Sequence, residues 1–373
     1  FQYLERKLYD AAVTLETAQM IRFNTTLGEL RPTNYGRIAS FYYISHQTMK
    51  YFHDHFERSM MEADVLNLVS NASEFQHIQV RNDELDELDR LHEDYSQFEF
   101  NTDPSSVVFK VLTLIQANVS RAKIRVSSLV SDCEFIMQSV TRLARALFEI
   151  AVDKNYSVQV YRCLQVSQMV EQQAWAERHP LLQFKELEVK GYKALDVLQN
   201  IPIEELQDMS EREVLDLIRS RHLANRVHHF CKAFPRVNLD VTVKPITEGV
   251  IRIQVLINAN FSWDTSIHGN VQHYYAWVED PAHDSIYHFE SFVVTKKLVV
   301  AKEPVELIFT VPLQKPHSME YFVTVANSKY MRKFGGCARG GADCGGFQMR
   351  RVRTGSIWRR SICCRVIPSR RSF

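Results

Sequence analysis

Residues Ser131–Ala151 read SDCEFIMQSVTRLARALFEIA, a stretch without glycine or proline that is long enough for about five helical turns. Ser131 and Asp132 at its start are suitable N-cap residues. On a helical wheel, apolar side chains cover most of the circumference. The face opposite Gln138 carries Ile136, Val140, Leu143, Leu147 and Ile150, and it is flanked by Phe135, Met137, Ala144, Ala146 and Phe148. This pattern predicts a helix that is buried on nearly all sides, at the centre of a bundle.

The same stretch leaves one narrow polar stripe, formed by Glu134, Gln138, Arg142, Arg145 and Glu149. A helix on a protein surface shows the reverse, an apolar stripe on a polar cylinder. The stripe has two interpretations. It faces water behind a gap in the bundle, or it contacts the phosphate backbone of a nucleic acid. Periodicity alone leaves both open.

Length and composition are those of a globular protein. The 373 residues allow two or three domains, and 45% hydrophobic and 24% charged residues are ordinary values. No apolar run approaches the roughly 18 residues of a membrane span, and no signal peptide is apparent at the start. We therefore expect no membrane partner. Because the first residue is Phe1, we also expect the chain to be a piece of a longer protein.

Charge is distributed unevenly along the chain. Residues 331–373 hold eleven of the 45 basic residues and one of the 44 acidic residues, a net charge of +10, which leaves −9 for residues 1–330. An acidic body does not attract polyanions everywhere, so any contact with nucleic acid must be local. The seven cysteines are odd in number, and four of them lie after residue 330. This usage predicts no disulfide framework and favours a reducing compartment, nuclear or cytoplasmic.

The first half of the chain reads as helical. Residues 1–33 suggest a helix followed by a short hairpin, the end of a winged-helix domain. Residues 34–184 predict a helical bundle of at least six helices. Thr33 should cap a helix that extends to about Phe56, with Phe41 on its buried face, and Asp103-Pro104 should open a later one.

The second half changes character twice. Residues 185–235 predict a helix-loop-helix, because Ser210–Glu213 forms a capping box before a short amphipathic helix. Residues 236–330 show strands of period two, such as VIRIQVLI at 250–257, which predict an antiparallel β-sandwich. Residues 331–373 are rich in glycine and arginine without an apolar period, and we expect a disordered basic tail.

No motif for catalysis, cofactor binding or metal binding is present. The sequence lacks a phosphate loop and a dinucleotide-binding glycine motif. Asp83–Asp86 spells the D-E-x-D of a helicase Walker B box, but no apolar strand precedes it, so a charged helix is the better interpretation. His53-x-His55 and His228-His229 have no cysteine or acidic partners at ligand spacing, and they are interpreted as solvated helix histidines.

Several segments nevertheless resemble one family, the Sec sixty-three module of Ski-two-like RNA and DNA helicases. The resemblance runs in order over roughly residues 10–330. It rests on Tyr35–Ile44 (YGRIASFYYI), Val69–Phe75, Val80-Arg81, Ser131-Asp132, Gln138-Ser139, Arg142, Arg145–Ile150, Pro180–Phe184, Lys244–Thr247, Phe261–Trp263, His268-Gly269 and Trp277–Pro281.

The resemblance implies both a fold and a function. The fold would be a multidomain combination of α and β structure: the end of a winged helix (1–33), a helical bundle (34–184), a helix-loop-helix (185–235) and a fibronectin type III-like sandwich (236–330). In this family the central bundle helix is a ratchet along the translocating single strand. By position, Gln138, Arg142 and Arg145 would contact that strand, and these residues lie on the polar stripe of the wheel.

The resemblance also implies partners. The ATP-hydrolysing RecA-like motor domains are absent from the sequence, so we expect no enzyme activity and no cofactor in this chain. The parent would be an ATP-dependent helicase that uses ATP and Mg²⁺. Its strand would be single-stranded RNA or DNA, and its other partners would be the motor domains and possible complex subunits. The alternative is a protein–protein interaction platform that docks a neighbouring helicase cassette or complex subunit, with the stripe unused.

Overall fold

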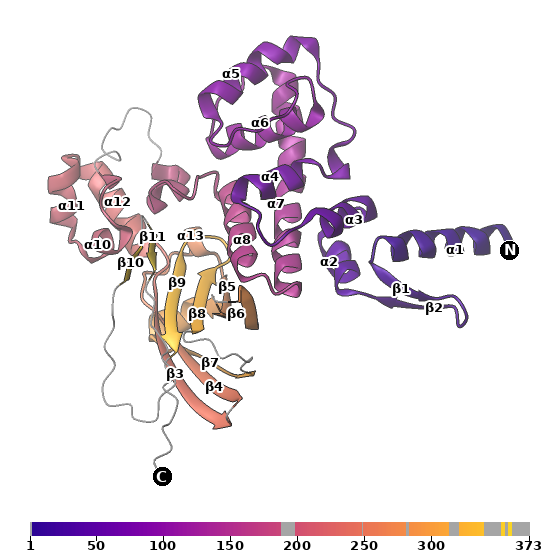
Figure 1. Cartoon of the computed structure of the whole chain (residues 1–373). Helices are drawn as coiled ribbons and strands as arrows, with labels where there is room; N and C mark the ends of the chain where they lie inside the picture. Colours follow the sequence, from indigo (N-terminus) through magenta and orange to yellow (C-terminus); the bar gives the residue numbers. More distant parts are fainter. Residues whose placement is uncertain are drawn as a thin grey trace. The chain divides into compact units, whose positions relative to one another are not determined.

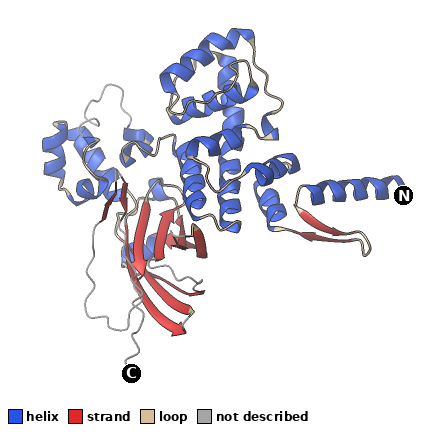
Figure 2. Cartoon of the chain, viewed as in Figure 1, coloured by secondary structure: helices blue, strands red, loops and turns tan. Residues whose placement is uncertain are grey.

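The computed structural model describes residues 2–187, 198–247, 249–280, 283–312, 321–338, 352–354 and 357–359. The chain divides into two compact units, Phe1–Trp175 and Ala176–Phe373, which are described separately. It is a mixed α and β protein, as predicted, with helices in both units and the large antiparallel sheets in the second (Figures 1 and 2). Within the described residues, no helix combines the length and hydropathy that a membrane span requires.

The first unit begins with a helix and a two-stranded hairpin. Helix α1 covers Gln2–Thr17, and strands β1 (Ile21–Asn24) and β2 (Glu29–Pro32) pair antiparallel. The hairpin leads directly into the bundle, because the side chain of Thr33 caps the next helix by accepting a hydrogen bond from Gly36 N at 3.1 Å. Gly36 is needed there, since a Cβ atom would collide with the carbonyl oxygen of Met20.

The bundle of the first unit consists of consecutive helices with short connections. They are α2 (Asn34–Tyr42), α3 (His46–His55), α4 (Glu62–Ser70), η1 (Ser73–Phe75), η2 (Asn82–Glu84), α5 (Leu85–Tyr95), α6 (Val107–Val119), α7 (Ser127–Asp153) and α8 (Ser157–Gln172). Helix α7 spans 27 residues, and α8 lies beside it (Figure 1).

Burial of α7 follows the predicted pattern closely. Ile136, Val140, Leu143, Leu147 and Ile150 all have no exposed surface. These side chains supply the centre of the bundle core, and each contributes roughly 1.5–3 kcal/mol relative to an exposed position. Phe135, predicted to flank the buried face, is instead 45% exposed.

Three predicted helix boundaries are wrong. Residues 34–56 do not form one helix, because Tyr43 adopts a left-handed conformation (φ 54°, ψ 53°) that ends α2. Helix α7 starts at Ser127, so Ser131 and Asp132 lie inside it and cap nothing. Helix α6 starts at Val107, where Ser106 is the cap. Side-chain bonds that periodicity does not reveal are present at two of these ends: Ser106 caps α6, and Arg142 bonds the carbonyl groups at the end of α2.

The helical part of the second unit has its own core. It comprises η3 (Pro180–Gln183), η4 (Lys185–Leu187), α10 (Ile203–Asp208), α11 (Glu211–Ile218) and α12 (Arg221–Ala233). The predicted capping box is present, with Ser210 and Glu213 bonded reciprocally. Phe184, Phe230, Phe234 and Tyr330 pack around one another in this core.

Two antiparallel sheets complete the second unit. The three-stranded sheet has the order β3-β4-β7 and the four-stranded sheet the order β6-β5-β8-β9. Strands and short helices are β3 (Val237–Thr247), β4 (Val250–Ala259), α13 (Thr265–His268), β5 (Val271–Asp280), β6 (Ser285–Thr295), α14 (Lys296–Ala301), β7 (Val305–Pro312), β8 (Tyr321–Asn327) and β9 (Lys333–Ala338).

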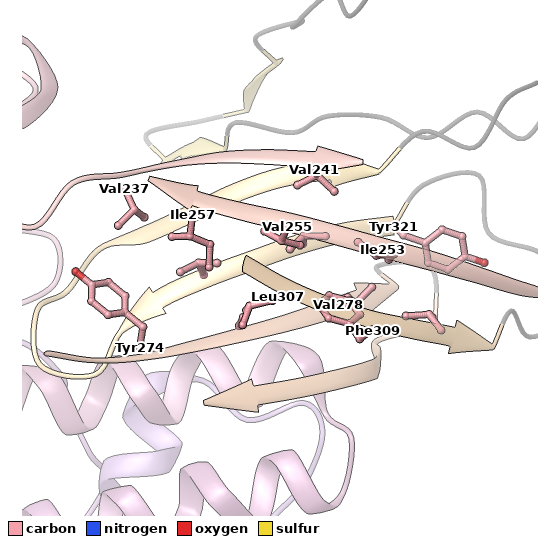
Figure 3. Close-up of a cluster of buried hydrophobic side chains, with 14 of the residues drawn as sticks. Val237, Val241, Ile253, Val255, Ile257, Tyr274, Val278, Leu307, Phe309 and Tyr321 are labelled. Atoms are coloured by element: carbon pink, nitrogen blue, oxygen red, sulfur yellow. The ribbon is translucent and has the colours of Figure 1, made fainter. Parts of the chain in front are cut away.

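The inner faces of these sheets share one hydrophobic core (Figure 3). Val241 and Ile253 come from the three-stranded sheet, and Tyr274 and Tyr321 come from the four-stranded sheet. The period-two alternation read at residues 250–257 is confirmed, because Ile251, Ile253, Val255 and Ile257 are all buried in this core.

The predicted start of the disordered tail at residue 331 is wrong, because the residues that follow directly are part of the fold. Met331 N donates to Gln183 Oε1 at 2.8 Å, and Lys333–Ala338 form strand β9 beside β8. Further on, β10 (Val352–Thr354) and β11 (Ile357–Arg359) pair with each other. The rest of the tail lies outside the described residues.

Candidate nucleic-acid interface

The polar stripe of α7 changes from exposed to half-buried along its length. Glu134 and Gln138 are exposed, whereas Arg142, Arg145 and Glu149 are partly covered. The three predicted site residues, Gln138, Arg142 and Arg145, therefore do lie on one stripe, spread over about 10 Å of helix axis. The side chain of Gln138 makes no hydrogen bond within the described residues, and the two arginines each bridge α7 to another helix.

Arg142 holds the end of α2. Its Nη1 atom donates to the carbonyl oxygens of Tyr43 at 2.6 Å and Tyr42 at 3.3 Å, and its Nη2 atom donates to Ser139 Oγ at 3.0 Å. Carbonyls at a helix C-terminus lack partners within the helix and attract cations. Arg142 thus stabilises the left-handed end of α2 from about 100 residues away in the sequence.

Arg145 and Glu149 are also engaged. Arg145 Nη2 lies 3.0 Å from Glu171 Oε2 on α8, and the Arg145 side chain is only 12% exposed. Glu149 accepts a hydrogen bond from the hydroxyl of Tyr42 at 2.7 Å. Three of the five stripe residues therefore connect α7 to α2 and α8, a role that the helical wheel did not reveal. Only Ser139, three residues before Arg142, had the spacing to suggest a partner.

Two aromatic side chains at the C-terminal end of α2 are unusually exposed. Phe41 is 72% exposed and Tyr43 is 84% exposed. Phe41 had been predicted to lie on the buried face of a continuous helix. Because the chain turns at Tyr43, the ring of Tyr43 is carried outward while Ile44 is buried. Sequence reasoning missed this feature, since nothing in YGRIASFYYI marks a helix end.

The D-E-x-D run has a structural role. Glu84 is fully buried, and its carboxylate receives hydrogen bonds from Lys110 Nζ at 2.6 Å and Ser128 Oγ at 2.5 Å, and an ion pair from Arg81. Burial alone would raise the pKa of Glu84, but the hydrogen bonds from Lys110, Ser128 and Arg81 hold it at about 2. The Glu84 carboxylate thus stabilises the bundle through these bonds.

The histidine pairs behave as ordinary helix side chains. The ring of His53 packs edge-on against Tyr35, and His55 Nδ1 lies 2.9 Å from the carbonyl oxygen of Tyr51. His229 pairs with Asp264 at 3.0 Å. In the part of the chain that the structure describes, no three metal-ligating side chains come together.

Comparison with known proteins points to one family. The model of the Sec63 Brl domain matches residues 32–333. Chicken "Activating signal cointegrator 1 complex subunit 3" is 32% identical over 331 residues, which cover 88% of this chain and 15% of that protein. "DExH-box ATP-dependent RNA helicase DExH14" of Arabidopsis thaliana is 34% identical over 323 residues, covering 86% and 15%.

A third relative is the "U5 small nuclear ribonucleoprotein 200 kDa helicase" of Drosophila melanogaster, which is 31% identical over 325 residues and matches 87% of this chain and 15% of its own length. The chain thus spans about 15% of the length of these relatives. Among solved structures, beta-glucosidase 3B from Thermotoga neapolitana covers 28% of this chain and 16% of its own, at 14% identity and a TM-score of 0.19, a likeness too slight to indicate the fold.

Proposed function

The chain belongs to the Sec63 Brl domain family, and from this premise we propose that it is the accessory module of a Ski-two-like helicase and grips the translocating single strand. The gripping residues are Gln138, Arg142 and Arg145 on α7. The observation that carries the proposal is their common position on one polar stripe of a helix whose opposite face is buried. The relatives named as helicases support the parent activity.

Arg142 retains the means to contact a phosphate. A guanidinium group has five N–H donors. Nη1 uses two for the Tyr42 and Tyr43 carbonyls and Nη2 uses one for Ser139, so Nε–H and one Nη2–H have no partner among the described residues. A side chain fixed in this way loses little conformational freedom on binding. Gln138 adds an exposed, neutral hydrogen-bonding group one turn away.

The remaining modules follow from the same proposal. Residues 1–33 would be the end of a winged helix, 185–235 the helix-loop-helix and 236–330 a fibronectin type III-like sandwich. The two antiparallel sheets with a common core support the last of these. The run Trp277–Pro281 favours a place in the first cassette of the large helicase subunit of the activating signal cointegrator complex.

Catalysis would belong to other parts of the parent protein. RecA-like motor domains would bind ATP and Mg²⁺ and hydrolyse the nucleotide. This chain would contribute only binding of the single strand. Neither nucleotide-binding motif occurs in its sequence. Single-stranded RNA is the preferred strand, because the relative from Arabidopsis is named an RNA helicase.

One observation favours a second candidate function, a platform for protein partners. Arg145 is paired with Glu171 and Arg142 with two carbonyl groups, so neither side chain is wholly available to a nucleic acid. In that case the stripe only joins helices, and the chain serves to dock a neighbouring cassette or complex subunit.

Salt dependence of strand binding separates the two functions. The salt slope is the slope of the logarithm of the binding constant against the logarithm of the salt concentration. Removing one arginine–phosphate interaction should flatten this slope by about 0.7 for a single strand. Arg142→Gln together with Arg145→Gln in the full chain should therefore flatten the slope of binding to single-stranded RNA by somewhat more than about 1. Arg252→Gln, an exposed change on β4 in the second unit, is the control for general charge loss. Unchanged affinity and slope in the double variant would leave the platform function.

A further inference from the structure

We infer that the ring of Tyr43 is a base-stacking platform, presented to the single strand by the helix end that Arg142 holds. This inference rests on the proposed function and adds to it a contact with the bases. An arginine contact recognises phosphates, which every nucleotide carries. A stacking contact requires the base itself.

The backbone at Tyr43 is arranged to expose its side chain. Helix α2 ends at Tyr42, Tyr43 takes left-handed dihedral angles, and the next residue, Ile44, is buried at 7% exposure with its N–H bonded to Ala39 O at 2.9 Å. Left-handed residues at helix ends are usually glycine or asparagine, because a Cβ atom is unfavourable there. A tyrosine at this position is costly, and its side chain makes little contact with the fold to offset that cost.

Exposure singles out this ring. At 84%, Tyr43 has the largest exposed fraction of any large apolar side chain in the described residues, and Phe41 at 72% lies two positions before it. A buried aromatic ring stabilises the core. An exposed ring leaves apolar surface in unfavourable contact with water and is typical of a contact surface. Arg142 on α7 donates to the carbonyl oxygens of Tyr42 and Tyr43, so its guanidinium group adjoins the stretch of backbone that carries the two exposed rings.

The local charge around Tyr43 favours a polyanion as the partner of this surface. Residues 33–53 contain Arg37 and Lys50, both exposed, and no aspartate or glutamate, within a body whose net charge is −9. Three carboxylates from other segments face this stretch, and each is engaged: Glu149 with Tyr42, Glu74 with the backbone N–H of Ser45, and Asp153 with Asn34. Aromatic rings beside cations are the combination that binds single strands.

The test removes the ring without disturbing the backbone. Tyr43→Gly suits a left-handed residue, so it should keep or increase stability while removing the platform. Tyr43→Phe keeps the ring and is the matched control. With a labelled single-stranded oligouridylate and the full chain, Tyr43→Gly should bind about tenfold more weakly, within the range for one stacked base, and Tyr43→Phe like the original chain. Because the ring is neutral, the salt slope should stay unchanged.

An abasic oligonucleotide of the same length completes the design. The original chain should prefer the oligouridylate over the abasic strand, and Tyr43→Gly should lose that preference. If Tyr43→Gly binds both strands as the original chain does, while Arg142→Gln still flattens the salt slope, the stacking inference is overturned and the proposed grip survives. If neither strand binds to any variant, the proposed function itself fails. If Tyr43→Gly weakens binding of a complex subunit but leaves binding of both oligonucleotides unchanged, the ring makes a protein contact instead and the stacking inference is overturned.

Discussion

The Nζ atom of Lys110 lies 2.6 Å from Oε2 of Glu84, and both side chains are completely buried. Lys110 also donates to Asp132 at 2.6 Å and to the carbonyl oxygen of Gln79 at 2.8 Å. Its ammonium group has three donors, and all three are used. The cluster joins α6 to η2 and α7. Because all of its donors are used, a buried lysine is tolerated in the first turn of an apolar helix.

Removing the lysine should strongly destabilise the first unit. Lys110→Met keeps the apolar stem but leaves the buried Glu84 carboxylate short of a partner, and breaking such a pair costs about 3–5 kcal/mol. Urea unfolding measures the loss. The double variant Lys110→Met with Glu84→Gln removes both charges and should recover part of it. A loss below about 1 kcal/mol in the single variant would contradict this account, because only solvated pairs are that weak.

Acid should weaken the same cluster. The pKa of Glu84 in the folded protein is about 2, below its ordinary value of 4.5, so the folded state binds fewer protons than the unfolded state. The stabilising contribution of Glu84 is therefore complete above about pH 4.5 and is lost as the pH falls toward 2. The measurement is the difference in unfolding free energy between the original chain and Glu84→Gln across this range. A difference that does not change with pH would refute the assignment.

Residues after Tyr330 should contribute to stability. Arg332 donates to Gln207, Pro235 and Glu204, and β9 extends the four-stranded sheet. A disordered tail, as the sequence predicts for residues 331–373, would leave the Tm of a chain ending at Tyr330 unchanged. The structure leads us to expect a Tm lower by more than about 4 °C for that chain. A chain ending at Ala338 keeps β9 and is the comparison, and equal melting of the two truncations would show that β9 adds nothing.

Shortening a side chain should reduce stability on the buried side of α7 and have little effect on the exposed side. Leu143 has no exposed surface, so Leu143→Ala should cost about 2–5 kcal/mol through the cavity it leaves. Gln138→Ala removes an exposed side chain and should change stability by less than about 0.5 kcal/mol. Thermal and urea unfolding of both variants provide the check, and a large cost at Gln138 would mean that this side chain supports the fold.

The purified chain should not hydrolyse ATP, with or without RNA. The sequence holds neither a phosphate loop nor a Walker B strand, and the glutamate of the D-E-x-D run, Glu84, is paired with Lys110. A coupled ATPase assay tests this, with the Glu84→Gln variant included. Activity that copurifies with the chain and disappears in Glu84→Gln would reverse the assignment of Glu84.

Local patterns in the sequence determined which surfaces are buried. The wheel of residues 131–151 predicted the core positions of α7, such as Val140 and Leu147, the alternation in VIRIQVLI predicted the inner face of β4, and the Ser210–Glu213 box predicted the start of α11. These features depend on residues within a few positions of one another, and periodicity and capping chemistry are local in that sense. The family resemblance added an expected order of modules.

Only the tertiary structure decided where helices end and which polar groups are paired. Arg142 bonds to Tyr43 across about 100 residues, and Lys110 meets Glu84 across 26. Neither bond has a signal in its own neighbourhood, because a guanidinium or ammonium group accepts any carbonyl or carboxylate that the fold brings within reach. The helix end at which Tyr43 is exposed carries such a distant bond. The sequence alone therefore predicted the stripe on α7, and packing between α2 and α7 determined what that stripe can contact.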